Sequence, residues 1–224
     1  YQIETTVDGK RFVTARGWQD FSEILQVYEA LDIPVDQEVV GQYLQHGRIA
    51  KDFAAYLDLY AKYKTDYQID GILKGVWKPS AIEKLKFAAF DERLSVVGLL
   101  ISCLGEIFSQ VQAVDEQVTE VYEQLKAKKA LEGELDEAIR ADFEAQVSRR
   151  EQMVEEAAEN LECAFDFCET AFGEGQELVV FVTELTINPY SSWFISENGC
   201  DRYYKYNKGL LFREGRQIGR ASCR

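Results

Sequence analysis

The chain has 224 residues, of which 46% are hydrophobic and 12% aromatic, and its formal net charge is -14. This apolar content suffices for a sizeable core and argues against disorder. An acidic chain of this kind lacks a basic face for nucleic acid and is repelled by anionic membranes, so we expect no nucleic acid and no membrane as partners.

The chain begins with Tyr1 and shows no signal-peptide pattern, and no apolar run approaches the roughly 20 residues that span a bilayer. We interpret the longest run, Leu94 to Leu104, as a buried helix face, and we expect a cytoplasmic protein. One histidine and five cysteines without a C-x-x-C pair make a zinc site or a disulfide framework unexpected. Cys163 and Cys168 are expected to pack within a helix.

Residues 1–13 are predicted to form a β-hairpin that turns at Asp8-Gly9. A helix should follow, with Thr14 as its N-cap and a buried stripe of apolar side chains. The stripe consists of Trp18, Phe21, Leu25 and Tyr28, widened by Ile24 and Leu31.

Arg16 falls in the first turn of this helix, where the backbone dipole already places partial positive charge. A carboxylate would be more favourable there, unless an anion binds and is held by the guanidinium and the helix amides together. The alternative is that Arg16 is solvated or pairs with Asp20, one turn further on.

The string Phe-Val-Thr-Ala-Arg-Gly-Trp-Gln-Asp-Phe-Ser at residues 12–22 resembles the start of the lid subdomain in MoxR-type AAA+ ATPases, and the similarity continues through residues 33–44. The resemblance implies that Arg16 is the sensor 2 arginine, which touches the terminal phosphate of bound ATP. It also implies ATP and Mg²⁺ as cofactors, held by a P-loop in an N-terminal AAA+ core that this chain lacks. Relatives act as chaperone-like, homo-oligomeric rings, often beside proteins with von Willebrand factor A domains.

The remainder of the lid is expected to be helical. Asp36 should cap a short helix to about Gln45, and His46 is expected at a surface or capping position. A longer helix then places its aromatic side chains in the core, namely those at 53, 56, 60 and 63, with Ile49 and Leu57. A short helix over 68–74 follows, and Ser80 should be the N-cap of the next one.

From Asp91 to Ala130 the pattern predicts one long helix with a heptad-like seam, formed by Ile107, Val111, Val114, Val118, Val121 and Leu125. A second long helix over 134–172 should return after Gly133, which gives an antiparallel hairpin arm over 91–172. Residues 131–173 hold 13 acidic against 3 basic residues. We interpret the acidic side as a solvated face, with a docking surface for a basic partner as the alternative.

The C-terminal part should contain a buried helix over 178–185, a short helix over 191–197 ended by Asn198-Gly199, and an amphipathic helix over 201–212. Residues 218–224 match one reading frame of a common sequencing adapter, so we expect a non-native tail. The predicted fold is mainly α: a helical lid bundle and a long antiparallel hairpin, with the short N-terminal β-hairpin. The predicted parts are 1–75, the end of the core and the lid; 76–173, the extension; 174–217; and 218–224.

The sequence contains no G-x-x-x-x-G-K-[ST], G-x-G-x-x-G, G-x-S-x-G or H-E-x-x-H motif. It therefore holds no complete active site, and we predict no catalytic or metal-binding residue within it. The first hypothesis is the C-terminal part of an AAA+ ATPase that remodels a partner protein, with Arg16 sensing ATP. The alternative is a non-enzymatic acidic adaptor that docks a partner through its hairpin arm.

Overall fold

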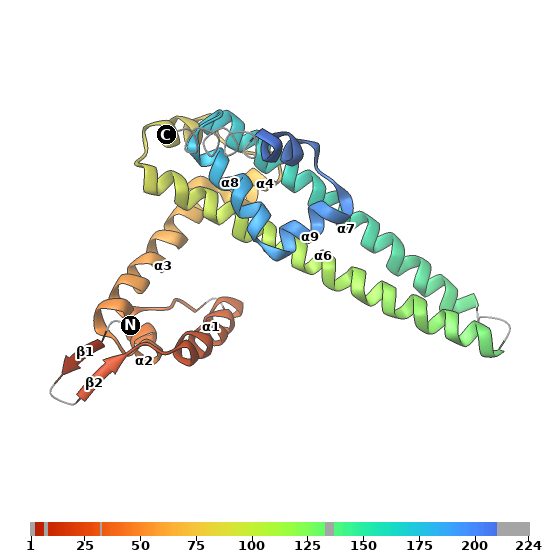
Figure 1. Cartoon of the computed structure of the whole chain (residues 1–224), viewed down its shortest axis with the longest axis horizontal. Helices are drawn as coiled ribbons and strands as arrows, with labels where there is room; N and C mark the ends of the chain where they lie inside the picture. The colour runs from red at the N-terminus through yellow and green to blue at the C-terminus, as the bar shows by residue number, and fades with distance from the viewer. Residues whose placement is uncertain (1–2, 7–8, 32, 133–136, 210–224) are drawn as a thin grey trace, which may run out of the picture. The chain divides into compact units, whose positions relative to one another are not determined.

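The computed structural model describes residues 3–6, 9–31, 33–132 and 137–209 (Figure 1). The chain divides into two compact units, residues 1–65 and 66–224. The predicted lid range 1–75 extends past the end of the first unit, because the short helix after it packs against helices of the second unit.

The first unit begins with two short antiparallel strands, β1 (Ile3–Thr6) and β2 (Gly9–Phe12), in which Ile3 faces Phe12. Residues 7 and 8, which include the predicted turn residue Asp8, lie outside the described residues. Helices α1 (Ala15–Ala30), α2 (Gln37–Tyr43) and α3 (Gly47–Tyr67) follow. They enclose a small core of Phe21, Val40, Leu44, Ala50 and Ala54.

The predicted helix starts of α1 and α2 are confirmed. Thr14 Oγ1 accepts a hydrogen bond from the amide of Gly17 at 2.9 Å, and Asp36 Oδ1 accepts from the amides of Glu38 and Val39 at 3.0 and 2.9 Å. Both caps satisfy amides that a helix leaves unpaired in its first turn. Local side-chain chemistry therefore sets where these helices begin.

Several predicted core positions of the first unit are wrong. Trp18 keeps 39% of its surface exposed, Tyr56 54% and Leu31 63%. Leu31 is the C-cap of α1, where the helical stripe no longer faces the core. Tyr56 belongs to a row of aromatic rings along α3 that extends from Phe53 to Tyr60, with centroids 5.7 and 6.2 Å apart.

The second unit consists of α4 (Ile69–Leu73), α5 (Pro79–Phe87), α6 (Phe90–Glu132), α7 (Glu137–Phe172), α8 (Gln176–Ile187) and α9 (Pro189–Asn198), and residues 201–209 are helical. The prediction of Ser80 as an N-cap is wrong. Lys78 occupies that position and Pro79 is the first helical residue, as suits a proline that has no amide to donate.

Helix α6 is the centre of this unit, because α7, α8 and α9 all pack against it. Phe108 of α6 stacks on Phe194 of α9 with centroids 4.2 Å apart, and both side chains are fully buried. The predicted buried face between Leu94 and Leu104 is confirmed. By length and composition alone, residues 90–127 of α6 could cross a membrane, and half of the apolar 18-residue window within this stretch is buried inside the protein.

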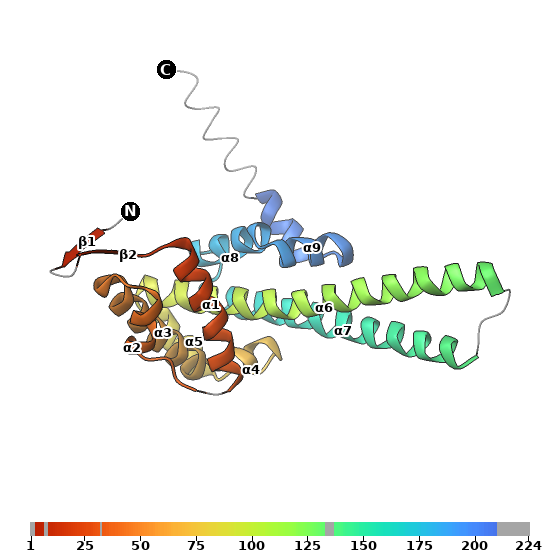
Figure 2. The ribbon, with the colours of Figure 1, turned by 90° about the horizontal axis from the view of Figure 1, so that it is seen from below.

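Beyond the body of the unit, α6 and α7 continue side by side as an arm, seen in Figures 1 and 2. From here on, the arm means residues 112–132 and 137–156, which are the outer part of the hairpin predicted over 91–172. Asp115 pairs with Arg150, and Tyr122 contacts Phe143, so seven residues forward on α6 (115 to 122) match seven back on α7 (150 to 143). The two long helices are thus antiparallel and in constant register, while the predicted break at Gly133 lies outside the described residues.

The helix over 201–209 is held to α7 by a tyrosine. Tyr206 donates a hydrogen bond from its hydroxyl to Glu169 Oε1 at 2.8 Å, and burial, with that bond, raises the pKa of Tyr206 to about 12. The ordinary tyrosine pKa is about 10, so the unfolded chain loses this proton first as pH rises. The contribution of the protonated Tyr206 hydroxyl to the free energy of unfolding is therefore complete below about pH 10 and is lost towards pH 12.

We therefore expect the urea midpoint of the chain to fall between pH 10 and 12, and the Tyr206→Phe variant to show a smaller fall. Far-UV circular dichroism at pH 9 and 11.5 measures both. The other tyrosines contribute equally to the two proteins, so an identical fall in the variant would show that Tyr206 does not carry the effect.

Candidate functional site

Arg16 is the second residue of α1, and the first turn of that helix contains no acidic residue. Its side chain is 88% exposed. Arg16 Nε lies 3.7 Å from Asp20 Oδ2, and Asp20 is itself half exposed. This distance exceeds the 2.7–2.9 Å of a charge-assisted hydrogen bond, so the pair is a weak surface contact that leaves the guanidinium accessible to an anion.

Gly17 explains how the start of α1 is positioned. A Cβ atom at Gly17 would lie 2.9 Å from the backbone oxygen of Tyr43, at the end of α2, and 3.3 Å from Thr14 Oγ1. The first turn of α1 therefore approaches the backbone of α2 more closely than any side chain allows. This contact seats the helix end that carries Arg16.

We expect Gly17→Ala to destabilise the first unit by about 1–3 kcal/mol, because the Tyr43 carbonyl belongs to backbone and cannot move aside easily. Gly41→Ala is the matched control in the same unit, since a Cβ there meets nothing within 4 Å. It should stabilise α2 by up to about 1 kcal/mol. Urea denaturation of both variants checks the contrast, and equal effects would contradict the close approach.

His46 takes the second of the two predicted positions, a helix cap, and its side chain is buried. Its Nδ1 accepts a hydrogen bond from the amide of Ile49 at 3.4 Å, directly before α3 begins at Gly47. The imidazole thus satisfies a first-turn amide of the helix, a structural task rather than a catalytic one.

Three of the described cysteines, Cys163, Cys168 and Cys200, are poor nucleophiles. Burial raises the pKa of the Cys200 thiol to about 11, and burial raises that of Cys168 further still. Burial, followed by the nearby Asp166, also raises the pKa of Cys163. The reactive species is the thiolate, so these groups stay protonated near neutral pH. As predicted, Cys163 and Cys168 pack within one helix, α7.

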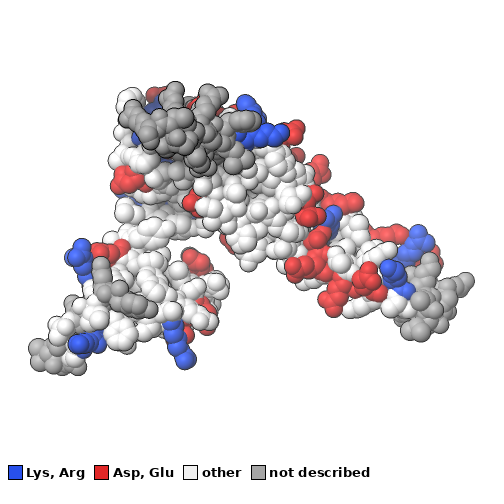
Figure 3. Space-filling model, in the orientation of Figure 1, with Lys and Arg blue, Asp and Glu red and all other residues white. Residues whose placement is uncertain are grey.

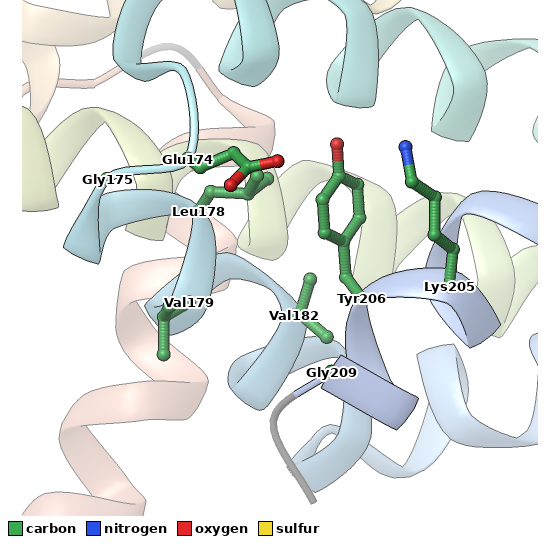
Figure 4. Close-up of a pocket in the computed structure, with 8 residues that line it drawn as sticks. All are labelled: Glu174, Gly175, Leu178, Val179, Val182, Lys205, Tyr206 and Gly209. Carbon is green, nitrogen blue, oxygen red and sulfur yellow. The ribbon is translucent and has the colours of Figure 1, made fainter. Parts of the chain in front are cut away.

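A cavity of about 190 Å³, which no sequence pattern pointed to, lies in the second unit (Figure 4). Its wall is largely apolar and includes Leu178, Val179 and Val182 of α8, while Glu174, Lys205 and Tyr206 complete the lining. It is smaller than the roughly 300–1,000 Å³ of pockets that enclose drug-sized ligands.

Within the described ranges, no group of three or more His, Cys, Asp or Glu side chains is arranged to hold a metal ion. Comparison with known proteins adds no relative: no family model, no curated protein and no solved structure matches the chain. A functional proposal for the chain therefore depends on the sequence resemblance around Arg16, with which the exposed position of that residue is compatible.

Proposed function

We propose that the chain is the C-terminal part of an AAA+ ATPase of MoxR type, in which Arg16 contacts the terminal phosphate of ATP bound to the core. The observation that supports this proposal is the exposed guanidinium at the capped start of α1, which within the described part of the chain pairs only loosely, with Asp20 at 3.7 Å. An arginine fork beside the positive end of a helix dipole suits a phosphate and costs stability without one.

On this proposal, the first unit is the lid, and ATP and Mg²⁺ are bound by a P-loop in a separate N-terminal core. The lid changes its position with the nucleotide state, and the ring of subunits uses that movement to remodel a partner protein. A protein with a von Willebrand factor A domain is the proposed class of partner, and the assembly works in the cytoplasm. These statements follow from the resemblance at residues 12–22 and 33–44.

The first experiment is to determine the coding sequence upstream of Tyr1. The proposal requires a Walker A lysine and a Walker B acidic pair within about 200–250 residues ahead of Tyr1, which is one domain's length of chain. A start codon directly ahead of Tyr1, or an upstream domain without a P-loop, would overturn it.

A further inference from the structure

The boundary between the two compact units falls inside a helix rather than in a loop. The first unit ends at Thr65, whereas α3 continues to Tyr67. Domain boundaries usually fall in flexible segments rich in proline, glycine and polar residues, but from 48 to 67 the sequence of α3 contains neither proline nor glycine. Ala50 and Ala54 of the same helix belong to the core of the first unit. One unbroken helix therefore joins that core to the second unit.

The last turn of α3 is held tightly within the second unit. Tyr67 is 1% exposed, and its hydroxyl donates a hydrogen bond to Glu92 Oε1 of α6 at 2.6 Å. Lys84 Nζ of α5 lies 4.7 Å from the centroid of the Tyr67 ring and donates to Asp66 Oδ2 at 2.9 Å. A charge-assisted hydrogen bond and a cation–π contact together fix the position of the ring. We call Asp66, Tyr67, Lys84 and Glu92 the clamp.

The residue that follows the clamp fixes how the chain leaves α3. Gln68 has φ 52° and ψ 55°, and among the described residues it alone combines a positive φ with a side chain. This left-handed conformation is unfavourable for a residue with a Cβ atom, and it persists only where the surrounding contacts determine it. Helix α4 begins at the next residue, and its Ile69 and Ile72 are fully buried. The end of α3 is thus held by the clamp on one side and by α4 on the other.

We propose that α3 couples the two units energetically, so that a change in the fold of the first unit reaches the clamp and α4 in the second. Helix formation is cooperative, and α3 is supported in its first half by the core of the first unit. When that support weakens, the last turn of the same helix should loosen as well. The use of this path by ATP, through movement of the lid, rests on the proposed function, whereas the coupling itself does not.

Hydrogen exchange of the whole chain, read by mass spectrometry, tests the coupling. Gly17→Ala perturbs the first unit from α1, outside the connecting helix. We expect it to speed exchange at residues 66–74 about threefold or more, in addition to exchange in α1 and α2. Gly41→Ala is the matched control, because a Cβ there meets nothing within 4 Å, and it should not speed exchange at either place.

An interruption of α3 should confine the effect to the first unit. Lys62 is exposed, and Lys62→Pro removes a backbone hydrogen bond in the middle of the connecting helix, whereas Lys62→Ala leaves the helix intact. With Lys62→Pro as the background, Gly17→Ala should no longer alter exchange at residues 66–74; with Lys62→Ala it should. If full exchange of α1 and α2 shows that Lys62→Pro unfolds the first unit, Ala61→Gly/Lys62→Gly is the milder interruption.

The clamp itself is tested by Tyr67→Phe, which removes the hydroxyl bonded to Glu92 and keeps the ring beside Lys84. It should reduce the effect of Gly17→Ala at residues 66–74. Acidic side chains line the arm on the face shown in Figure 3, and no clamp residue lies in the arm, so its amides provide the internal reference.

Three results would overturn the coupling. These are unchanged exchange at residues 66–74 in Gly17→Ala, an effect that survives the interruption of α3, and an effect that Tyr67→Phe leaves undiminished. No measurement involves a nucleotide, so failure of the Arg16 assignment would leave all these readouts unchanged.

Discussion

If the proposed function is correct, Arg16→Ala is expected to lower ATP turnover of the full-length protein at least about tenfold. A hydrogen bond to a charged group contributes about 1.5–3 kcal/mol, and 1.4 kcal/mol corresponds to a factor of ten. The fold should not change, because the side chain is 88% exposed and its contact with Asp20 is 3.7 Å long. Steady-state ATP hydrolysis measures the loss, and unchanged circular dichroism shows that the fold is intact.

Arg48 provides a matched control for this experiment. It is the second residue of α3, as Arg16 is of α1, and its Nε also lies 3.7 Å from an aspartate oxygen four residues later, on Asp52. It is 79% exposed. Arg48→Ala should therefore keep full turnover, while Arg16→Lys should recover part of it by retaining the charge without the planar fork. Equal turnover in Arg16→Ala and wild type would defeat the lid assignment.

The same comparison shows what the sequence could and could not predict about the candidate site. The position of Arg16 in a first turn followed from Thr14, whose hydroxyl cap is a short-range signal. Arg48 reproduces nearly the same local geometry, so neither charge nor helix position distinguishes the two arginines. The resemblance around residues 12–22 is what selects Arg16. The close approach of Gly17 to Tyr43 depends on how α1 meets α2, which no local pattern specifies.

The long helices were predictable because the apolar positions that stabilise them repeat along the sequence. A seam that repeats over many turns specifies a helix by itself, so the span of α6 and its packing on α7 were anticipated, as was α8 as a buried helix. Where two start signals compete, the prediction failed: Pro79 begins α5, although Ser80 is the better capping residue. The exposure of Trp18 and Tyr56 also escaped prediction, since it depends on how few elements cover a small unit.

The contact with the largest expected effect on stability is an ion pair between residues far apart in the chain. Arg93 Nη1 of α6 lies 2.8 Å from Glu177 Oε1 of α8, and the Glu177 side chain is 6% exposed. Glu177 lies in the first turn of α8, where the helix dipole favours a carboxylate. A Cβ at Gly175 would come within 2.7 Å of Glu177 Oε2, so the backbone ahead of α8 also closes over the carboxylate.

We expect Arg93→Ala to lower the free energy of unfolding by about 3–5 kcal/mol, because it leaves a carboxylate buried without its cation. Glu177→Ala should cost less, since the charge that it leaves unpaired is on the Arg93 side chain, which is 30% exposed, whereas the Glu177 side chain is 6% exposed. Urea denaturation followed by far-UV circular dichroism measures both variants.

Replacing both partners tests whether the pair or the packing carries this stability. Arg93→Met with Glu177→Leu leaves neither charge buried, so most of the loss in Arg93→Ala should be recovered. The recovery should be incomplete, because Arg93 also lies over the ring of Phe90, 5.5 Å from its centroid. In the Arg93→Ala and Glu177→Ala cycle we expect a coupling energy well above the roughly 0.3–0.5 kcal/mol of independent sites. Simple additivity would mean that α6 and α8 are held together by their apolar faces alone.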